Sequence, residues 1–359
     1  MHERTRGVPR RTVLAGLASG AAATLASPAV LAQASAGQVV VRGLGGAYQA
    51  AMEKAVFGPF TGATGIKVVT QPATAAQVRA MVEAKRVQID VVDLGSTGQL
   101  ALQKVGALEP LDYANFKLTN PDDIQQDVRL SHMVGNLYFS TVMVYNTETF
   151  SADNHPHSWA EFWDVKRFPG ARTLADQTSG AAEFEFALLA DGVAMEKLYP
   201  IDLDRAFAAL DRIKGNVVKW WDTGAVSAQL LERKEAVLGG LWNGRAQDLI
   251  DKGAPLAIEW NEAKRQLQAL SIVKDAPNLA NAHRFIDFAL QPKVQAELTR
   301  YIAYGPTNKK AFEFVRPEDG QKLPSEPTHF AQSFDQNQDW WGDNLTEVGR
   351  RWQAWVLKR

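Results

Sequence analysis

Apolar positions along the first third of the chain recur with two different spacings. Short β-branched runs predict strands at 38–42, 66–70 and 89–94, and helical spacing predicts helices at 47–57 and 75–85. The run at 89–94 is nearly all apolar, which is typical of a parallel strand that helices cover on both faces. This β-α-β-α-β order predicts a doubly wound α/β unit whose ligand loops follow the carboxyl ends of the strands.

A second series of strands and helices follows an apolar strand at 142–146. Ser158 and Glu161 form the pattern of a capping box and predict the start of a helix. Because no low-complexity linker separates the two series, we expect two lobes that share short crossovers. The further expected strands are 172–175, 217–221, 236–241, 256–259 and 270–273, and the helices are 181–190, 203–214, 227–234, 245–252, 280–290, 292–302 and 344–356.

The N-terminal segment has the pattern of an export signal. Four arginines and one glutamate precede a weakly apolar run at 13–31, and small residues follow at Ala32, Ala34 and Ala36. A positive region, an apolar region and an A-x-A site predict a secretory signal peptide, which we place at 1–34. The Arg10-Arg11 pair resembles a twin-arginine signal, although Sec export stays open. Polar residues interrupt the apolar run and disfavour a membrane anchor, so we expect a periplasmic protein.

Composition narrows the function classes. At about 150 residues per domain, 359 residues predict two domains. The absence of cysteine excludes disulfides, cysteine-ligated zinc, iron–sulfur clusters, thiol catalysis and a lipid attached through sulfur. The formal charge is −1, from 39 basic and 40 acidic residues; removal of 1–34 takes away four basic and one acidic residue and leaves −4. The chain has no excess of basic residues, so its charge gives no indication of a nucleic-acid partner.

Catalytic and cofactor motifs are incomplete. A dinucleotide fingerprint that starts at Gly43 has Tyr48 at its third glycine position, and Gly95-Ser96-Thr97-Gly98 lacks the spacing of a nucleophile elbow. His155-Pro156-His157, with no carboxylate cluster nearby in sequence, is more typical of a loop than of a metal site. We therefore predict no enzyme, no cofactor and no metal, with an exported enzyme on a similar scaffold as the remote alternative.

Eight collinear segments cover essentially the whole chain after the signal. Together they resemble the periplasmic solute-binding proteins of ABC importers, in the spermidine/putrescine-binding family. They are Gly45-Gly46-Ala47-Tyr48, Asp90 to Leu94, Ser140-Thr141 with Val144-Tyr145-Asn146, Ser158 to Trp163, Lys166 to Gly170, Ala187 to Gly192, Leu241 to Arg245, and Tyr304 to Asn308.

The resemblance implies a two-lobed binding protein of type II that closes like a hinge on a small-molecule ligand. By that analogy the first lobe comprises 37–144 plus 267–305, and the second comprises 145–266 plus 306–359. The closed form would dock, as a monomer, on a membrane permease powered by an ATPase. All ten tryptophans, the first being Trp159, would belong to the second lobe.

The resemblance also implies which side chains hold the ligand. In polyamine-binding relatives, aromatic rings sandwich the methylene chain and carboxylates hold the ammonium groups. Strand alternation turns only one ring of the pair Trp220 and Trp221 inward. Besides Trp221, the candidates without charge are Trp242 and Tyr304 in matching motifs, Trp341 where the family often has a polar contact, and Tyr48, Ser96, Thr97 and Thr141 on loops at strand ends.

Charged positions leave the ligand open. Ser179 and Gln268 stand where the spermidine binder has carboxylates, and Arg245 stands where a putrescine binder has an aspartate. Asp93 and Asp176, both at strand ends, remain candidate carboxylates. Two aspartates in the cleft would suit a diamine or polyamine such as putrescine or spermidine, which is the ligand that we predict, with a zwitterion or anion as the alternative. An inward Arg245 would suit a zwitterion such as an ω-amino acid, or a small organic anion, because its planar fork binds a carboxylate through two hydrogen bonds.

Overall fold

The structure is a computed structural model that describes residues 37–358 except Leu44 and Ala181. The signal peptide expected at 1–34 lies outside the described residues. Within them, no helix is long and apolar enough to cross a membrane. Residues 35–359 form one compact unit.

The described strands form a single mixed sheet in the order β2-β1-β3-β9-β5-β8-β6-β7, with β4 and β11 added on β9 and β10 added on β5. Neighbouring strands are parallel within β2-β1-β3 and within β8-β6-β7, and the pairs that β5 and β9 form along this path are antiparallel; the short β11 pairs with β9 in parallel. The strands are β1 (Gln38–Gly43), β2 (Lys67–Pro72), β3 (Val91–Gly95), β4 (Leu108–Glu109), β5 (Val134–Asn146), β6 (Arg172–Ala175), β7 (Val217–Trp221), β8 (Leu238–Trp242), β9 (Leu256–Val273), β10 (Gly305–Pro306) and β11 (Phe334–Asp335).

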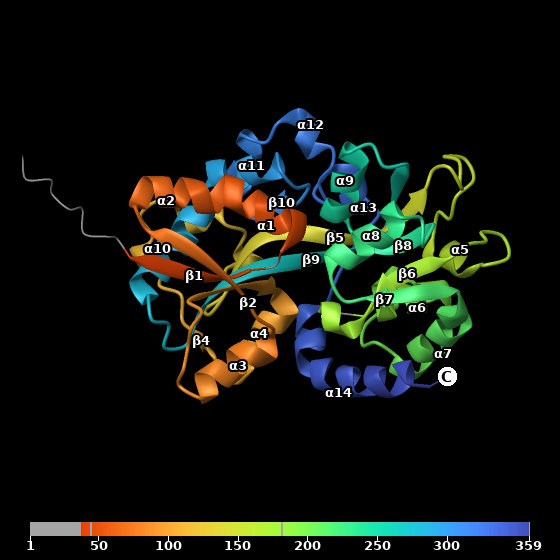
Figure 1. Ribbon diagram of the computed structural model, residues 1–359, viewed down its shortest axis with the longest axis horizontal. Coiled ribbons are helices and arrows are strands. Elements are labelled where there is room, and N and C mark those ends of the chain that lie inside the picture. The colour runs from red at the N-terminus through yellow and green to blue at the C-terminus, as the bar shows by residue number, and fades with distance from the viewer. Residues whose placement is uncertain (1–36, 44, 181, 359) are drawn as a thin grey trace, which may run out of the picture. The chain divides into compact units, whose positions relative to one another are not determined.

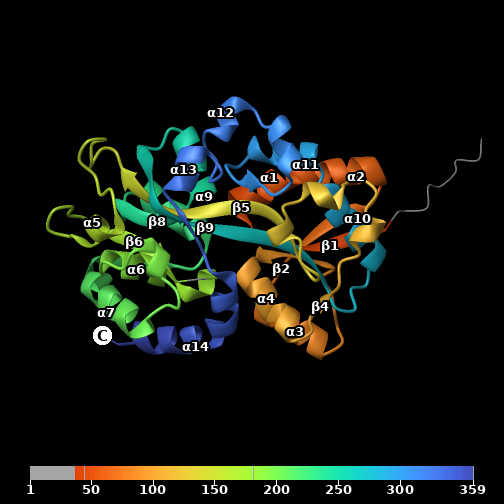
Figure 2. The same ribbon diagram turned by 180° about the vertical axis from the view of Figure 1, so that it is seen from behind.

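The two parallel groups define two lobes, and β5 and β9 run through both of them (Figure 1). We call the part that carries β1–β3 the first lobe and the part that carries β6–β8 the second lobe. In the first lobe, α1, α2 and α10 lie on one side of the strands, and α3 and α4 lie on the other (Figures 1 and 2). This arrangement is the predicted α/β fold with helices on both faces of a sheet.

The helices largely follow the predicted spacing, and the first one is longer than predicted. It continues through a π-helical turn and past Pro59 to Thr64, because a proline is tolerated in the first turn of the new segment. Gly65, at φ 72°, ends it in the left-handed conformation. The helices are α1 (Gly46–Met52), η1 (Glu53–Phe57), α2 (Gly58–Thr64), α3 (Ala75–Glu83), α4 (Ser96–Lys104), α5 (Trp159–Trp163), α6 (Phe184–Ala190), α7 (Leu203–Ile213), α8 (Gly224–Glu232), α9 (Asn243–Asp251), α10 (Leu279–Ala289), α11 (Pro292–Thr299), α12 (Pro317–Gly320), α13 (Pro327–Ala331) and α14 (Gln338–Val356).

Short 3₁₀ turns connect several of these elements. They are η2 (Tyr113–Asn115), η3 (Pro121–Asp123), η4 (Gln126–Val128), η5 (Gln177–Ser179), η6 (Met195–Lys197), η7 (Lys214–Asn216) and η8 (Lys309–Glu313).

The prediction of two separate strands at 256–259 and 270–273 is wrong, because β9 is continuous from Leu256 to Val273. The intervening residues are polar, so their sequence resembles a loop. Their charges are nevertheless compensated within the sheet. Lys264 lies 3.2 Å from Glu183 and 3.1 Å from Glu185, and Arg265 pairs with an aspartate of β11. Compensated charges can remain in a buried strand.

Each lobe has its own hydrophobic core. In the first lobe, Phe60 packs edge-on against Phe285 and Phe288 of α10, with ring centroids 5.4 and 5.5 Å away. In the second, Trp159 stacks on Phe186 at 3.7 Å, and both rings are fully buried. The two cores hold the edges of the lobes in place, so that the ends of β3 and β8 face the region described next.

Candidate ligand-binding site

A buried carboxylate lies at the carboxyl end of β3. Asp93 is 2% exposed and accepts hydrogen bonds from Tyr48 Oη at 2.7 Å and from Gln268 Nε2 at 2.6 Å. Tyr48 comes from α1, and Gln268 comes from β9, where it is paired in register with Gly95. Three elements of the first lobe therefore fix the orientation of this carboxylate.

Burial alters the protonation of this group. It raises the pKa of Asp93 to about 6, while the hydrogen bonds from Tyr48 and Gln268 and the charge of Arg42 oppose the rise. Arg42 does not bind the carboxylate directly: it donates to the backbone oxygens of Asp93 at 2.8 Å and of Ala73 at 2.5 Å. Each carboxylate oxygen accepts one side-chain donor and keeps a lone pair for another.

Aromatic rings connect this carboxylate to the second lobe. The ring of Tyr304 lies 5.9 Å from that of Tyr48 and 5.8 Å from that of Phe139. Phe139 in turn lies 5.9 Å from Trp242, and Trp242 lies 5.2 Å from Trp221. Such tilted and edge-to-face pairs are the usual geometry of packed aromatic rings. The rings form a continuous apolar wall across β5, from α1 to the end of β8.

A buried guanidinium lies against Gly45 and Gly46, where α1 begins. Arg245, in the first turn of α9, is 5% exposed and donates from Nη2 to the backbone oxygen of Gly45 at 3.2 Å. Its Nε is buried without a hydrogen-bond partner, and within the described part of the chain no carboxylate pairs with it. A buried arginine with free donors is costly unless another group satisfies it. The backbone at Gly46 approaches so closely that a Cβ there would lie 2.5 Å from Nη1.

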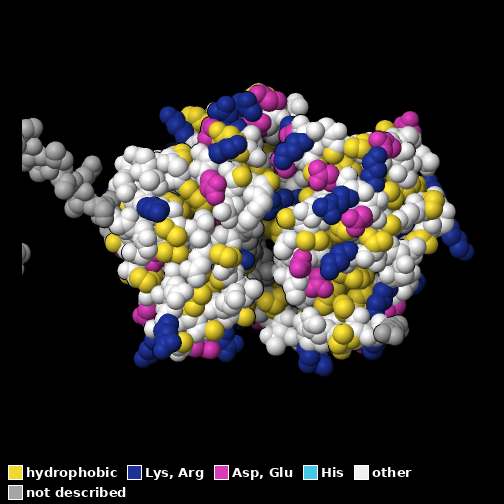
Figure 3. Space-filling model, in the orientation of Figure 1, with side chains coloured by type: hydrophobic (Ala, Val, Ile, Leu, Met, Phe, Trp, Pro, Cys, Tyr) yellow, Lys and Arg dark blue, Asp and Glu magenta, His cyan; other side chains and the backbone are white. Residues whose placement is uncertain are grey.

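The arrangement places a carboxylate, a guanidinium and several aromatic rings near the boundary between the lobes. Figure 3 shows the surface hollowed between the half that carries α1 to α4 and the half that carries α8 and α14. The hydrogen bond from Arg245 to Gly45 and an ion pair between Lys104 of α4 and Asp343 of α14 join the two sides. A carboxylate and a guanidinium can each hold a ligand group of the opposite charge through charge-assisted hydrogen bonds.

Four of the predicted site residues contact one another in this region: Tyr48, Asp93, Gln268 and Tyr304. Trp242 is joined to Tyr304 through Phe139, and Arg245 bonds to the backbone of Gly45. Thr141 pairs in register with Trp242, and its hydroxyl donates to Gln266 at 2.7 Å. Ser96 and Thr97 are buried at the start of α4, directly after β3. The sequence analysis missed Arg42, Asn136 and Phe139. The last two lie in the first half of β5, which was not predicted as a strand.

Four predicted residues are not brought to this group. Trp341 is fully buried in the second-lobe core and donates to Glu185 at 2.6 Å. Asp176 caps the turn η5 and accepts from Trp352 at 2.9 Å, so its oxygens are used within the lobe. Ser179 lies at the end of the same turn. Trp221 is fully buried behind Trp242, and its Nε1 donates to a backbone oxygen. The side chains of Trp341, Asp176 and Trp221 therefore have packing or capping roles.

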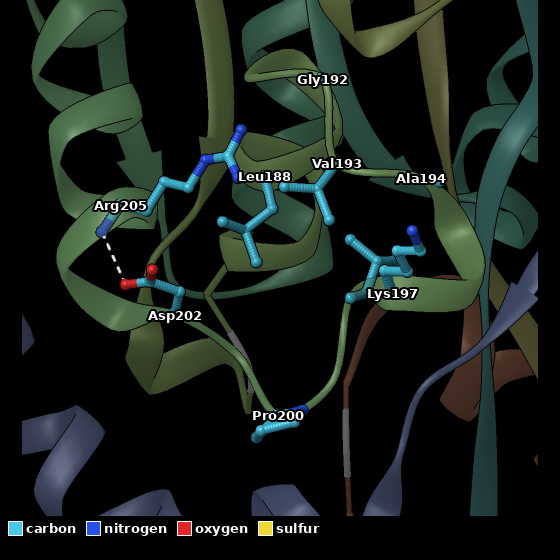
Figure 4. Close-up of a pocket in the computed structure, with 9 residues that line it drawn as sticks. Leu188, Gly192, Val193, Ala194, Lys197, Pro200, Asp202 and Arg205 are labelled. Carbon is cyan, nitrogen blue, oxygen red and sulfur yellow. Dashed lines mark hydrogen bonds between the residues drawn. The ribbon is translucent and has the colours of Figure 1, made fainter.

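A separate pocket of about 350 Å³ lies in the second lobe between α6, η6 and α7 (Figure 4). The backbone N–H of Arg205 donates to Asp202 at 3.0 Å, which is the cap of α7, and the Arg205 side chain is paired with Asp191. Its polar groups are therefore engaged in local structure, and it lacks the buried, unpaired charge of the inter-lobe region.

Comparison with known proteins identifies the family. The family described as bacterial extracellular solute-binding protein matches residues 55–328. The chain belongs to this family. Its relatives are solute-binding proteins of ABC transporters and not enzymes.

Three similar proteins extend the comparison. The gamma-aminobutyric acid-binding protein of Pseudomonas aeruginosa is 34% identical over 337 residues, which cover 92% of this chain and 94% of that protein. The solved structure of the PBP AgtB from A. tumefaciens R10 with agropinic acid has a TM-score of 0.82 at 34% identity, covering 90% of this chain and 99% of the other. The solved structure described as a GABA receptor has a TM-score of 0.81 at 33% identity, and the match covers 90% of this chain and 98% of the other.

The resemblance to polyamine-binding proteins is more distant. The spermidine/putrescine-binding periplasmic protein of Escherichia coli is 24% identical over 268 residues, which cover 72% of this chain and 75% of that protein. The expected solute-binding family is thus confirmed, and the polyamine-binding proteins that match are more distant relatives, at 24% identity.

Proposed function

We propose that this chain is the periplasmic binding component of an ABC importer and that its ligand is a small zwitterion of the ω-amino acid class, with γ-aminobutyrate as the reference compound. The observation that carries the proposal is the buried Arg245, whose Nε has no hydrogen-bond partner. A diamine would bring a second positive charge to this guanidinium, whereas a carboxylate would satisfy its free donors. The names of the relatives, gamma-aminobutyric acid-binding protein and agropinic acid complex, support the same ligand chemistry.

Asp93 would receive the amino end of the ligand. Its two oxygens are held by Tyr48 and Gln268, and each retains acceptor capacity for an ammonium N–H. Charge-assisted hydrogen bonds of this kind are about twice as strong as neutral ones. The rings of Tyr304, Phe139 and Trp242 would line the methylene chain between the two charged ends.

Closure of the two lobes would couple binding to transport. We place the lobe boundaries at 37–144 plus 267–305 and at 145–266 plus 306–359, because β5 and β9 are the long strands that run between the lobes. The β5–β9 register shifts between Thr141 and Met143, close to the first boundary, and such an irregularity can serve as a hinge. A ligand that contacts Asp93 of the first lobe and Arg245 of the second would stabilise the closed form, which the permease would recognise.

Export follows from the same role. A signal peptide at 1–34, removed on translocation, would deliver a free periplasmic protein, since a chain without cysteine cannot carry a lipid on sulfur. N-terminal sequencing of the protein from a periplasmic extract would locate the cleavage site.

Calorimetric titration of the chain without residues 1–34 tests the ligand. Three ligands are compared. γ-Aminobutyrate carries one positive and one negative charge, putrescine carries two positive charges, and butyrate carries one negative charge. We expect γ-aminobutyrate to bind most tightly and Arg245→Gln to weaken it about 30-fold or more, because the ligand carboxylate loses its charged partner in a buried site. Tighter binding of putrescine than of γ-aminobutyrate would overturn the zwitterion assignment.

Arg350→Gln is the matched control. Arg350 lies on the exposed side of α14, where its Nε donates to Glu347 at 2.9 Å, so its loss should leave the affinity unchanged. If γ-aminobutyrate bound equally well to the wild type and to Arg245→Gln, the ligand carboxylate would lie elsewhere.

A further inference from the structure

Two histidines and one glutamate converge outside the inter-lobe region. His155 and His157 lie in the loop before α5, and Glu259 lies on β9. Glu259 Oε2 is 3.2 Å from His155 Nε2 and 3.1 Å from His157 Nδ1, and one ligand atom from each residue lies within 4.8 Å of the others. The sequence analysis treated the His-x-His pair as an ordinary loop because no carboxylate is near it in sequence. The fold supplies one from about a hundred residues further along.

The side chains of His155 and Glu259 are each held by a further contact. The ring of His155 stacks on Tyr145 at 4.0 Å, and its Nδ1 lies 3.2 Å from the backbone oxygen of Ser151. The remaining oxygen of Glu259, Oε1, accepts from the backbone N–H of Asn261 at 2.8 Å. These contacts orient His155 Nε2 and Glu259 Oε2 toward one point, as outer partners do around metal ligands.

The backbone of His157 is held in the same way. Its N–H donates to Glu161 at 2.8 Å, and its carbonyl oxygen accepts from Asn261 Nδ2 at 2.8 Å. Asn261 therefore braces both the glutamate and one histidine. The side chain of His157 is 53% exposed, so an ion in solution can reach the cluster directly.

The hydrogen-bond pattern is compatible with a lone pair directed at the centre of the cluster. A backbone carbonyl can only accept, so Nδ1 of His155 donates in its contact with Ser151. In the neutral ring, Nε2 of His155 then presents a lone pair toward Glu259 Oε2, and a cation between the two would be stabilised by both.

We propose that His155 Nε2, His157 Nδ1 and Glu259 Oε2 form a binding site for a divalent transition metal, with Zn²⁺ as the reference ion. Nitrogen and oxygen ligands lie about 2.0–2.2 Å from zinc, so neighbouring ligands of a tetrahedral ion are about 3.3–3.5 Å apart. The observed separations of 3.1 and 3.2 Å are close to that geometry. Water would occupy the fourth position, on the exposed side of His157.

The site would have a structural role distinct from solute binding. It would tie the loop before α5 to β9 in the second lobe, and no hydrogen bond of its three residues reaches the described residues of the inter-lobe region. Metal binding to the folded state alone would raise the free energy of unfolding.

Titration of the untagged, chelator-treated chain with Zn²⁺ tests the proposal. We expect one ion per chain by elemental analysis after gel filtration, a higher melting temperature with Zn²⁺ than without, and the visible absorption of a low-symmetry site when Co²⁺ is used instead. His157→Ala should weaken Zn²⁺ binding by at least about 10-fold, since loss of an outer partner alone costs about 10- to 100-fold. His157 is exposed, so this variant should fold normally.

His329→Ala is the matched control, because this ring stacks on Trp260 at 3.9 Å and takes no part in the cluster. Glu259→Gln should reproduce the loss seen with His157→Ala while keeping the size of the side chain. Binding of γ-aminobutyrate should be the same in all these variants. Substoichiometric Zn²⁺, or equal uptake by the wild type and His157→Ala, would show that the three residues form only a hydrogen-bonded cluster.

Discussion

Tyr48 donates a 2.7 Å hydrogen bond from its hydroxyl to Oδ2 of Asp93, and both side chains are almost fully buried. The contact links α1 to the end of β3, and the ring of the same tyrosine packs against Tyr304. One residue thus orients the only carboxylate that we assign to the ligand and also forms part of the apolar wall. The first two predictions follow from this relationship.

Tyr48→Phe should weaken binding of γ-aminobutyrate about 10- to 100-fold. The variant removes one donor from a buried carboxylate and keeps the ring against Tyr304, and a hydrogen bond to a charged group contributes about 1.5–3 kcal/mol. Isothermal calorimetry measures the change. Tyr301→Phe serves as the control because Tyr301 is exposed. Unchanged affinity in Tyr48→Phe would mean that Asp93 does not hold the ligand.

Asp93 should also make the unliganded protein less stable as the pH rises. Its folded pKa of about 6 lies above its ordinary value of 3.8, so the folded state retains the proton longer than the unfolded state does. The contribution of this group to the free energy of unfolding is therefore fully present below about pH 4 and is lost as the pH rises through about 6. Asp93→Asn should remove this part of the pH dependence and be more stable by about 1–3 kcal/mol at neutral pH. Urea unfolding of the wild type and of Asp93→Asn at two pH values measures the difference in their free energies of unfolding. A difference that does not change with pH would contradict the prediction.

The affinity for γ-aminobutyrate should also depend on the ionisation of Asp93, and it should rise with pH where the stability falls. An ammonium ligand binds the ionised form of Asp93, so its affinity should fall about tenfold between pH 7 and pH 5 as the carboxyl group takes up its proton. Calorimetry in buffers of different ionisation enthalpy should show proton release on binding near pH 6. In Asp93→Asn the affinity should be low and nearly constant over this range. A flat wild-type profile would count against an ammonium contact at Asp93.

Several parts of this arrangement could be predicted from the sequence, and for identifiable reasons. The parallel strands β1, β3, β6 and β7 are short apolar runs, and such runs are easily recognised. Tyr48, Trp242 and Tyr304 were identified because they stand in motifs that resemble a known family. The part of β9 around Lys264 could not be predicted, because a charged segment is compatible with a buried strand only when its partners, which lie far away in sequence, are known.

Contacts between residues far apart in sequence also explain why the site predicted from the sequence differs from the one in the structure. Trp341 was placed at the ligand because of its motif position, yet its indole N–H donates to Glu185, a buried acceptor that no local pattern reveals. Phe139 was missed because the first half of β5 contains glycine, asparagine and serine, which are uncommon in strands. Sequence patterns thus identified many of the strands and the family, whereas the contacts between side chains could be found only from the folded structure.

Trp242→Ala should weaken binding of γ-aminobutyrate by about 1–3 kcal/mol and leave the protein folded. The ring is only partly buried and contacts Phe139 and Trp221 with its edges, so its removal widens the inter-lobe wall without opening either core. Trp242→Phe, which retains an aromatic face, should lose less than the alanine variant. Calorimetry reports both, and an alanine variant with wild-type affinity would place this ring away from the ligand.

Lys264→Met should destabilise the protein by about 3–5 kcal/mol, because it leaves the buried carboxylates of Glu183 and Glu185 without their cation. Burial raises the pKa of Glu183 to about 7 even with Lys264 present, so the folded variant should favour protonated carboxyl groups still more strongly. A folded pKa above the ordinary value gives stability that is present at low pH and lost as the pH rises. Urea unfolding should therefore show a larger loss of stability relative to the wild type at pH 8 than at pH 5.5. Adding Glu183→Gln and Glu185→Gln to Lys264→Met should recover part of the lost stability, since neutral amides need no buried cation. If the triple variant were as unstable at pH 8 as Lys264→Met alone, the loss of stability would come from packing around the lysine stem and not from charge.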